Sequence, residues 1–238
     1  MTTPRPAAEH SDYRDADGEG VCPLCGGTGT VTYWRDGYEY GRECECMARK
    51  RSRARAQRSG LGELYDRYTL VRYTDARPWQ AALRRKALDY LKDGAGWFFV
   101  CGRSGSGKTH LTAAVARELI EAGCETRYFM WRQDAPRLKA LVNDPRYEER
   151  MRALVDSDVL VIDDLWKGGS VSDADVNLAF ELLNSRYNLP KRRTLISSEL
   201  TLEEIMRIDE AVGSRIYERA GGYVLKTGDE NLRLTGIT

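Results

Sequence analysis

One eight-residue segment constrains this chain more than any other feature. Residues 102–109, Gly-Arg-Ser-Gly-Ser-Gly-Lys-Thr, match the pattern G-x-x-x-x-G-K-[ST] at every fixed position. Glycines let a backbone curl until its N–H groups point at phosphate oxygens, and the N-terminus of a following helix adds partial positive charge. An apolar run before the segment and an amphipathic pattern after it favour a phosphate-binding loop over an ordinary glycine turn.

The loop predicts a site for a nucleotide with Mg²⁺. We expect Lys108 to neutralise the β- and γ-phosphates, and the Thr109 hydroxyl to ligate the Mg²⁺ ion. The expected nucleotide-binding residues are Gly102, Arg103, Ser104, Gly105, Ser106, Gly107, Lys108, Thr109 and Asp163.

Strand and helix patterns alternate along most of the chain. The predicted strands lie at residues 97–101, 126–131, 159–162, 194–197 and 223–226. The predicted helices lie at residues 47–59, 108–122, 134–155 with a break at 143–145, 173–187, and 201–219 with an interruption near Gly213. This alternation predicts an α/β fold in which helices sandwich a mostly parallel, five-stranded sheet, as in the ATPase branch of phosphate-loop proteins.

Two adjacent acidic residues end the strand predicted at residues 159–162. Ligands bind at the carboxyl edge of a parallel sheet, so Asp163 and Asp164 are expected beside the phosphate loop. Asp163 would hold Mg²⁺ through water, and Asp164 would polarise the attacking water as a general base. The alternative is an acidic turn that caps a helix.

Polar residues farther along the chain are candidates for completing the site. Ser197-Ser198-Glu199 follows the fourth strand, and a polar group here could sense the γ-phosphate or position water. The alternative is a turn or helix cap before the capping box Thr201-Leu202-Glu203-Glu204. Arg215 could reach the γ-phosphate of a neighbouring subunit, or it could be a surface arginine. The catalytic candidates are Lys108, Asp164, Ser198, Glu199 and Arg215.

Four of the six cysteines lie close together near the N-terminus. Cys22, Cys25, Cys44 and Cys46 form a C-x₂-C-x₁₈-C-x-C pattern, and four thiolates satisfy tetrahedral Zn²⁺. Asp36-Gly37 lies between β-forming residues and predicts a hairpin. A segment this short and polar needs a metal to fold, so we favour a zinc-binding module over four unligated thiols in a flexible arm.

The net charge of +1 hides an uneven distribution. Residues 1–48 carry four basic and nine acidic residues, whereas residues 49–58 carry six basic residues and no acidic ones. The chain as a whole is therefore not a strongly basic nucleic-acid binder. The basic run itself has two readings, a contact with DNA phosphates or a solvated linker helix.

These patterns predict four regions and a cytoplasmic protein. The regions are a disordered tail at 1–20, a zinc-binding module at 21–48, a basic linker helix at 49–60 and an ATPase domain at 61–238. No apolar run is long enough for a membrane helix, and no secretory signal begins the chain. In a reducing compartment, clustered cysteines favour a metal over disulfides.

Four segments together resemble the DnaC-type replicative helicase loaders, above all their phage- and prophage-encoded branch. The segments are 102–109 with His110-Leu111, Ile162-Asp163-Asp164-Leu165, Ile196-Ser197-Ser198-Glu199-Leu200, and residues 208–216. The transposon ATPase IstB is a close relative. The resemblance covers residues 59–238 and implies an AAA+ ATPase fold with little or no C-terminal lid domain. It also implies loading of a hexameric DnaB-type helicase onto single-stranded DNA in a bacterial or phage-infected cell.

The resemblance also implies roles for particular residues. Asp163 and Asp164 take the Walker B positions, and Arg215 is the arginine finger, which requires self-association into an oligomer. The N-terminal module would contact the helicase. Two departures stand out: Glu199, after Ser198, occupies a sensor position that is often Asn or Asp, and Asp164 replaces a common Glu, which predicts slow hydrolysis.

The resulting expectation is an ATPase with ATP or ADP, Mg²⁺ and Zn²⁺ as cofactors. Two alternatives stay open, an IstB-like transposition helper and a nucleotide-gated zinc-ribbon adaptor with negligible turnover. A neighbouring transposase gene would favour the helper, and neighbouring replication genes would favour the loader.

Overall fold

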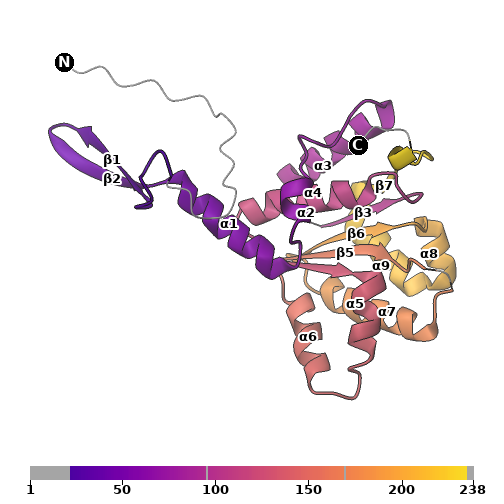
Figure 1. Ribbon diagram of the computed structural model, residues 1–238. Coiled ribbons are helices and arrows are strands. Elements are labelled where there is room, and N and C mark those ends of the chain that lie inside the picture. Colours follow the sequence, from indigo (N-terminus) through magenta and orange to yellow (C-terminus); the bar gives the residue numbers. More distant parts are fainter. Residues whose placement is uncertain (1–21, 95, 169, 235–238) are drawn as a thin grey trace. The chain divides into compact units, whose positions relative to one another are not determined.

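The computed structural model describes residues 22–94, 96–168 and 170–234, and the chain divides into two compact units. The first unit ends at Arg51 and the second begins at Ser52, so the division falls inside one helix, α1 (Glu45–Ser59) (Figure 1). The predicted boundaries at residues 48 and 60 lie on either side of this division and stay predictions. The predicted tail at 1–20 lies outside the described residues.

The first unit contains a two-stranded antiparallel hairpin. Strands β1 (Thr30–Arg35) and β2 (Tyr38–Glu43) pair along their whole lengths. Asp36 and Gly37 connect them with φ angles of 53° and 81°. Two consecutive positive φ angles are what a tight hairpin turn requires, and Asp-Gly supplies them at low cost.

The second unit is built on five parallel strands in the order β4-β5-β6-β3-β7. The strands are β3 (Trp97–Cys101), β4 (Thr126–Met130), β5 (Val159–Leu165), β6 (Arg193–Ser198) and β7 (Val224–Lys226). The helices are α2 (Leu64–Arg67), α3 (Pro78–Asp93), α4 (Lys108–Glu121), α5 (Trp131–Lys139), α6 (Arg146–Val155), α7 (Asp173–Tyr187), α8 (Leu202–Ile208) and α9 (Glu210–Ala220). None of the described helices combines the length and the apolarity that crossing a membrane requires.

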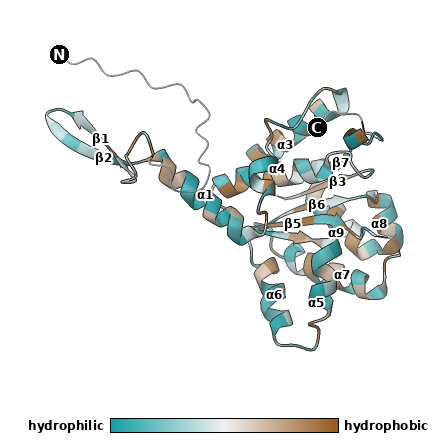
Figure 2. Cartoon of the chain, viewed as in Figure 1, coloured by the Kyte–Doolittle hydropathy of each residue, from teal (hydrophilic) through white to brown (hydrophobic). Residues whose placement is uncertain are grey.

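Every residue of β3 is buried, because helices cover both faces of this sheet. Phe98 and Val100 pack with α3 and α4 on one face, whereas Trp97 and Phe99 pack with α5, α7, α8 and α9 on the other. Figure 2 shows the apolar strands lying between helices with hydrophilic outer faces. The predicted α/β fold with a five-stranded parallel sheet is therefore confirmed.

The predicted helix at 201–219 is two helices, and the interruption near Gly213 was placed wrongly. The break falls at Asp209, whose extended backbone (φ −150°, ψ 112°) ends α8 and whose carboxylate accepts a hydrogen bond from Val212 N at 2.7 Å to cap α9. Gly213 lies inside α9. A Cβ atom there would come within 2.4 Å of Met206 Cγ and 3.0 Å of Met206 Cα, so glycine permits the two helices to approach closely.

Replacing Gly213 by alanine should therefore destabilise the chain. We expect Gly213→Ala to lower the free energy of unfolding by about 1–3 kcal/mol, because the overpacking outweighs the higher helix propensity of alanine. Denaturant titration measures the change. Gly222→Ala is the matched control, since a Cβ atom there meets nothing within 4 Å. Equal stability of the two variants would contradict the packing role of Gly213.

Candidate functional site

The phosphate loop lies between the end of β3 and the start of α4. Gly102, Gly105 and Gly107 have φ angles of 141°, 77° and 88°, in the left-handed region that favours glycine. A Cβ atom at Gly102 would lie 2.0 Å from Thr227 Oγ1, and one at Gly105 would lie 2.0 Å from Asn231 Oδ1. Backbone conformation and close packing therefore both require glycine in this loop.

The C-terminal part of the chain supplies that close packing. Thr227 N donates a hydrogen bond to Cys101 O at 2.9 Å, and Leu232 N donates one to Gly105 O at 3.0 Å. The Thr227 hydroxyl also donates to Ser106 Oγ at 2.8 Å. No sequence motif marks this segment, so its contact with the loop was not predicted.

Lys108 is held inside the loop at the start of α4. It is only 4% exposed, and its Nζ donates to Arg103 O at 2.9 Å, an oxygen that also accepts from Ser106 Oγ at 2.8 Å. Burial lowers the pKa of Lys108, and the nearby carboxylates of Asp164 and Glu199 oppose that shift. A buried ammonium at the N-terminus of a helix fits an anionic ligand.

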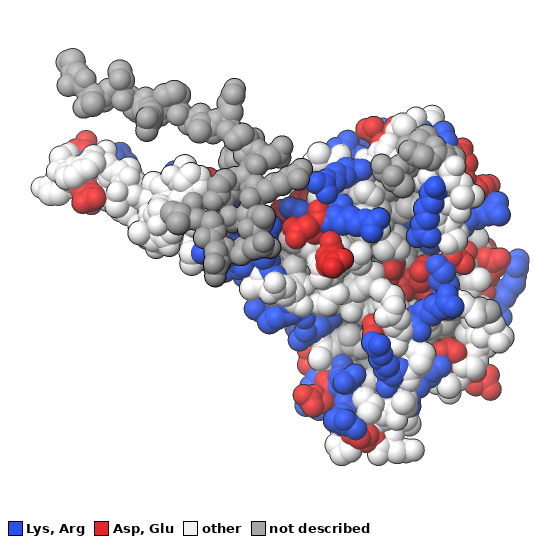
Figure 3. Space-filling model, viewed as in Figure 1, with Lys and Arg blue, Asp and Glu red and all other residues white. Residues whose placement is uncertain are grey.

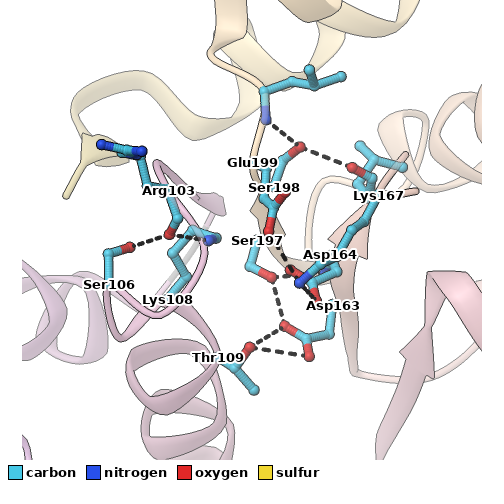
Figure 4. Close-up of polar contacts among 12 residues, drawn as sticks. Arg103, Ser106, Lys108, Thr109, Asp163, Asp164, Lys167, Ser197, Ser198 and Glu199 are labelled. Carbon is cyan, nitrogen blue, oxygen red and sulfur yellow. Dashed lines mark hydrogen bonds and ion pairs between the residues drawn. The ribbon is translucent and has the colours of Figure 1, made fainter. Parts of the chain in front are cut away.

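Asp163 connects four elements at the carboxyl edge of the sheet. Asp163 lies in the last part of β5, and its buried carboxylate accepts hydrogen bonds from Thr109 Oγ1 at 3.0 and 3.2 Å (Figure 4). It also accepts from the Tyr128 phenol of β4 at 2.6 Å and from Ser197 Oγ of β6 at 2.5 Å. Thr109 and Asp163, the two expected Mg²⁺ ligands, therefore lie in direct contact.

A β-bulge brings Asp164 to the same edge. The pairing of β5 with β6 shifts by one residue between Ile162 and Leu165. Asp164 has a φ angle of 56°, and its backbone N–H donates to Ser197 Oγ at 2.8 Å. Consecutive side chains of a regular strand face opposite sides of the sheet. The irregular backbone lets Asp164 line a cavity in front of the phosphate loop, although Asp163 precedes it directly in the chain.

Lys167 joins two of the expected catalytic residues. Its Nζ lies 2.9 Å from Asp164 Oδ2 and 3.1 Å from Glu199 Oε1 (Figure 4). Burial acts to lower the pKa of Lys167, but the hydrogen bonds to the two carboxylates outweigh it and raise that pKa. Burial acts to raise the pKa of Glu199, and the contact with Lys167 more than reverses that effect. The Lys167 ammonium and the Glu199 carboxylate are therefore charged at neutral pH.

Ser198 has different partners from the neighbouring serine. Its hydroxyl donates to Leu165 O at 2.8 Å and accepts from Leu200 N at 3.1 Å, so it secures the backbone after β6. Ser197 instead contacts Asp163 and Asp164. Of the two serines, Ser198 was predicted as catalytic, although Ser197 is the one that contacts the two aspartates, and no sequence pattern pointed to Tyr128 or Lys167. Alternation along β6 separates the two serines, but choosing between them requires the strand order.

A cavity of about 590 Å³ opens in front of the loop and is lined by Ser104, Lys108, Thr109 and residues of the 67–80 segment. His110 stacks on Tyr68 at 4.7 Å between ring centroids, and it meets the edge of Tyr73 at 5.2 Å. Among the described residues, Tyr73 Oη and Gln80 Nε2 are buried without a hydrogen-bond partner. A cavity with cations, aromatic rings and orphaned polar atoms fits a nucleotide.

Arg215 lies away from this cavity, on α9. Its Nε donates to Asn184 Oδ1 at 3.0 Å and one terminal nitrogen donates to Ala211 O at 2.8 Å. The guanidinium also lies over the rings of Phe180 and Tyr187, at 4.9 and 5.5 Å from their centroids. The guanidinium is thus preorganised on the surface formed by α7 and α9.

The four N-terminal cysteines lie together in the first unit. Their sulfur atoms are all within 4.8 Å of one another, and all four residues are buried. Cys22 Sγ lies 3.7 Å from Cys44 Sγ, and Cys25 Sγ lies 3.6 Å from Cys46 Sγ. Four converging thiols are the donor set of structural zinc sites, so the cluster fits Zn²⁺.

Comparison with known proteins identifies the family. The family model described as "IstB-like ATP binding protein" matches residues 63–235, which is most of the chain. The chain belongs to this family. It is an IstB-like ATP-binding protein with an AAA+ fold.

Two curated proteins of Bacillus subtilis (strain 168) are similar to this IstB-like chain. The uncharacterized protein YqaM is 33% identical over 215 residues, which cover 84% of this chain and 67% of YqaM. The phage-like element PBSX protein XkdC is 30% identical over 236 residues, which cover 91% of this chain and 87% of XkdC. One of these two relatives is thus a protein of a phage-like element.

A solved structure shares the fold. The structure described as the DnaC helicase loader aligns with a TM-score of 0.56 over 70% of this chain and 100% of that one, at 22% identity. The resemblance to the IstB and DnaC-like proteins is thereby confirmed, and at this level of identity the structural likeness concerns the fold.

The cysteine cluster of this IstB-like protein should hold zinc. We expect the purified chain to bind about one zinc ion, and Cys44→Ser to reduce the bound zinc to near zero, because three thiolates leave the tetrahedral site incomplete. Elemental analysis after dialysis measures the content. Cys124→Ser, outside the cluster, should keep its zinc. Full zinc binding by Cys44→Ser would contradict the assignment.

Proposed function

We propose that this IstB-like protein is an ATPase that loads a DnaB-type replicative helicase onto single-stranded DNA. The observation that carries the proposal is the contact between Thr109 of the phosphate loop and Asp163 of β5, inside a fold shared with a helicase loader. This contact supports a magnesium–ATP site, and the family supports ATP as the nucleotide.

The chain's own residues provide the binding and the chemistry of that site. Backbone N–H groups of the loop and Lys108 hold the phosphates, and Thr109 and Asp163 would hold Mg²⁺. The ion neutralises phosphate charge when bound. Asp164 orients the attacking water and accepts its proton. Because an aspartate is one methylene shorter than a glutamate, we expect slow turnover.

Arg215 is proposed to act on a neighbouring subunit. Its guanidinium is held by Asn184 and by two aromatic rings on α7, so its position is fixed before any partner arrives. A preorganised cation costs little to present to the γ-phosphate of an adjacent protomer. This role requires an oligomer, which the proposal includes.

The first unit is proposed as the helicase-docking module. Trp34 and Tyr38 of the hairpin are 72% and 70% exposed, and Leu24 is 58% exposed. Large exposed aromatic side chains are enriched at protein interfaces, where they bury much area at low entropy cost. A zinc-bound base would hold the hairpin rigid.

Ion pairs favour the linker interpretation of the basic run at 49–58. Arg53 pairs with Asp66 at 3.7 Å, and Arg55 and Arg58 pair with Glu125 at 3.7 and 3.2 Å. On the face shown in Figure 3, basic and acidic side chains of the second unit are interspersed. Arginines that already pair with carboxylates gain less from DNA phosphates, so we propose a linker helix here.

A transposition helper is the second candidate, because the matching family model is named after IstB. In that case the partner would be a transposase in place of a helicase. The ATP site would be the same, and the difference would lie in what the first unit contacts.

A pull-down tests the loader proposal. We expect the full chain to retain a DnaB-type helicase with ATP and to retain less of it with ADP. Lys108→Ala should lose this difference, because the phosphates of the nucleotide are no longer neutralised. Trp34→Ala should reduce the recovered helicase at least about fivefold, as loss of an aromatic anchor does. The amount of bound helicase is measured by gel densitometry.

Val142→Ala is the control, since Val142 is 59% exposed in the second unit. Retention of a transposase, with no retention of helicase under any nucleotide, would replace the loader by the transposition helper. If the Lys108→Ala variant still hydrolyses ATP at steady state, the assignment of the phosphate loop as the catalytic site is wrong.

A further inference from the structure

Lys167 follows β5 in a turn that directs its side chain back toward Asp164. The Lys167 N–H donates to Asp164 O at 3.0 Å, and Asp164 and Trp166 both have positive φ angles, 56° and 58°. Non-glycine residues rarely adopt such angles and are strained in them. The strained turn thus holds a lysine beside the expected general base.

The Lys167 ammonium bridges carboxylates from two different strand ends. It contacts Asp164 in the last part of β5 and Glu199 after β6, and its side chain is 24% exposed. Asp164 is only 20% exposed. A partly buried pair is screened less by water than a surface pair, so this bridge holds Asp164 firmly.

Lys167 also lines the nucleotide cavity together with Lys108 and Thr109. Lys108 already contacts the loop carbonyl of Arg103 and lies deep in the loop. Lys167 lines the cavity together with Asp164, and it is the second lysine among the lining residues, so its ammonium is available to a bound phosphate chain. A terminal phosphate carries more charge than either carboxylate and competes for this cation.

We propose that Lys167 distinguishes ATP from ADP by binding the terminal phosphate of ATP and releasing Asp164 when it does so. With ADP, Lys167 returns to Asp164 and Glu199, so Asp164 stays in its ion pair and cannot act as the general base. This inference rests on the proposed ATP site and adds a device that makes Asp164 available only when a γ-phosphate is present.

Equilibrium binding of the two nucleotides tests the proposal. We expect Lys167→Met to raise the Kd for Mg²⁺–ATP about tenfold, because a charge-assisted contact is lost, and to change the Kd for ADP less than about twofold. Isothermal titration calorimetry measures both values without requiring turnover. Lys167→Arg, which keeps the positive charge, should restore part of the ATP preference.

Lys139→Met is the matched control. Lys139 pairs with Asp175 at 2.6 Å, and the two side chains are 26% and 20% exposed, close to the values for Lys167 and Asp164. Lys139 does not line the nucleotide cavity. Its loss should leave the ratio of the ATP and ADP affinities unchanged.

Glu199→Gln provides a second test, in which the preference for ATP over ADP should change in the opposite direction. This test remains informative even if Lys167→Met fails to fold. Removing one carboxylate frees Lys167, so the preference for ATP over ADP should increase by a few-fold. An unchanged or reduced preference would overturn the proposal.

Nucleotide binding by the wild-type chain distinguishes an error about Lys167 from an error about the proposed ATP site. Where the wild-type chain binds both nucleotides and Lys167→Met weakens them equally, Lys167 has only a structural role and the ATP site stands. Where the wild-type chain binds neither nucleotide, the proposed function fails together with the role of Lys167.

Discussion

The Asp163 carboxylate is the group on which the geometry of the site depends. It is 4% exposed and accepts hydrogen bonds from Thr109, Tyr128 and Ser197. A buried carboxylate is costly unless its oxygens are hydrogen-bonded, so these donors are a condition for placing a charge there. Because they come from α4, β4 and β6, the same bonds fix the phosphate loop relative to the end of β5.

The irregular backbone after Asp163 produces the second half of the site. The β-bulge and the positive φ of Asp164 cost about 1–2 kcal/mol of local strain. This irregular backbone brings two adjacent carboxylates to one edge of the sheet, where each has different neighbours. Asp163 is enclosed by hydroxyl groups, whereas Asp164 faces the cavity and the ammonium of Lys167. Different surroundings allow the two carboxylates different roles.

Local patterns predicted the fold and the centre of the site. Residues 102–109 were recognisable because the loop needs glycines and a lysine at fixed spacing, and the apolar runs predicted the strands. Contacts between distant segments were not predictable in this way. The choice of Ser197 over Ser198 depends on which strand neighbours β5, and the contact of Asn231 with Gly105 joins residues 126 positions apart. Gly213 was misread as a helix break because close helix packing leaves no local pattern.

Asp163 and Asp164 have different roles in the proposed site, and Mg²⁺-dependent ATP binding by their asparagine variants tests this difference most directly. Asp163→Asn should lose the part of the ATP affinity that depends on Mg²⁺, because a neutral amide is a poor ligand for a hard cation. Asp164→Asn should keep that affinity and lose hydrolysis. An Asp163→Asn variant with the full Mg²⁺-dependent affinity, or an Asp164→Asn variant that loses it, would contradict these roles.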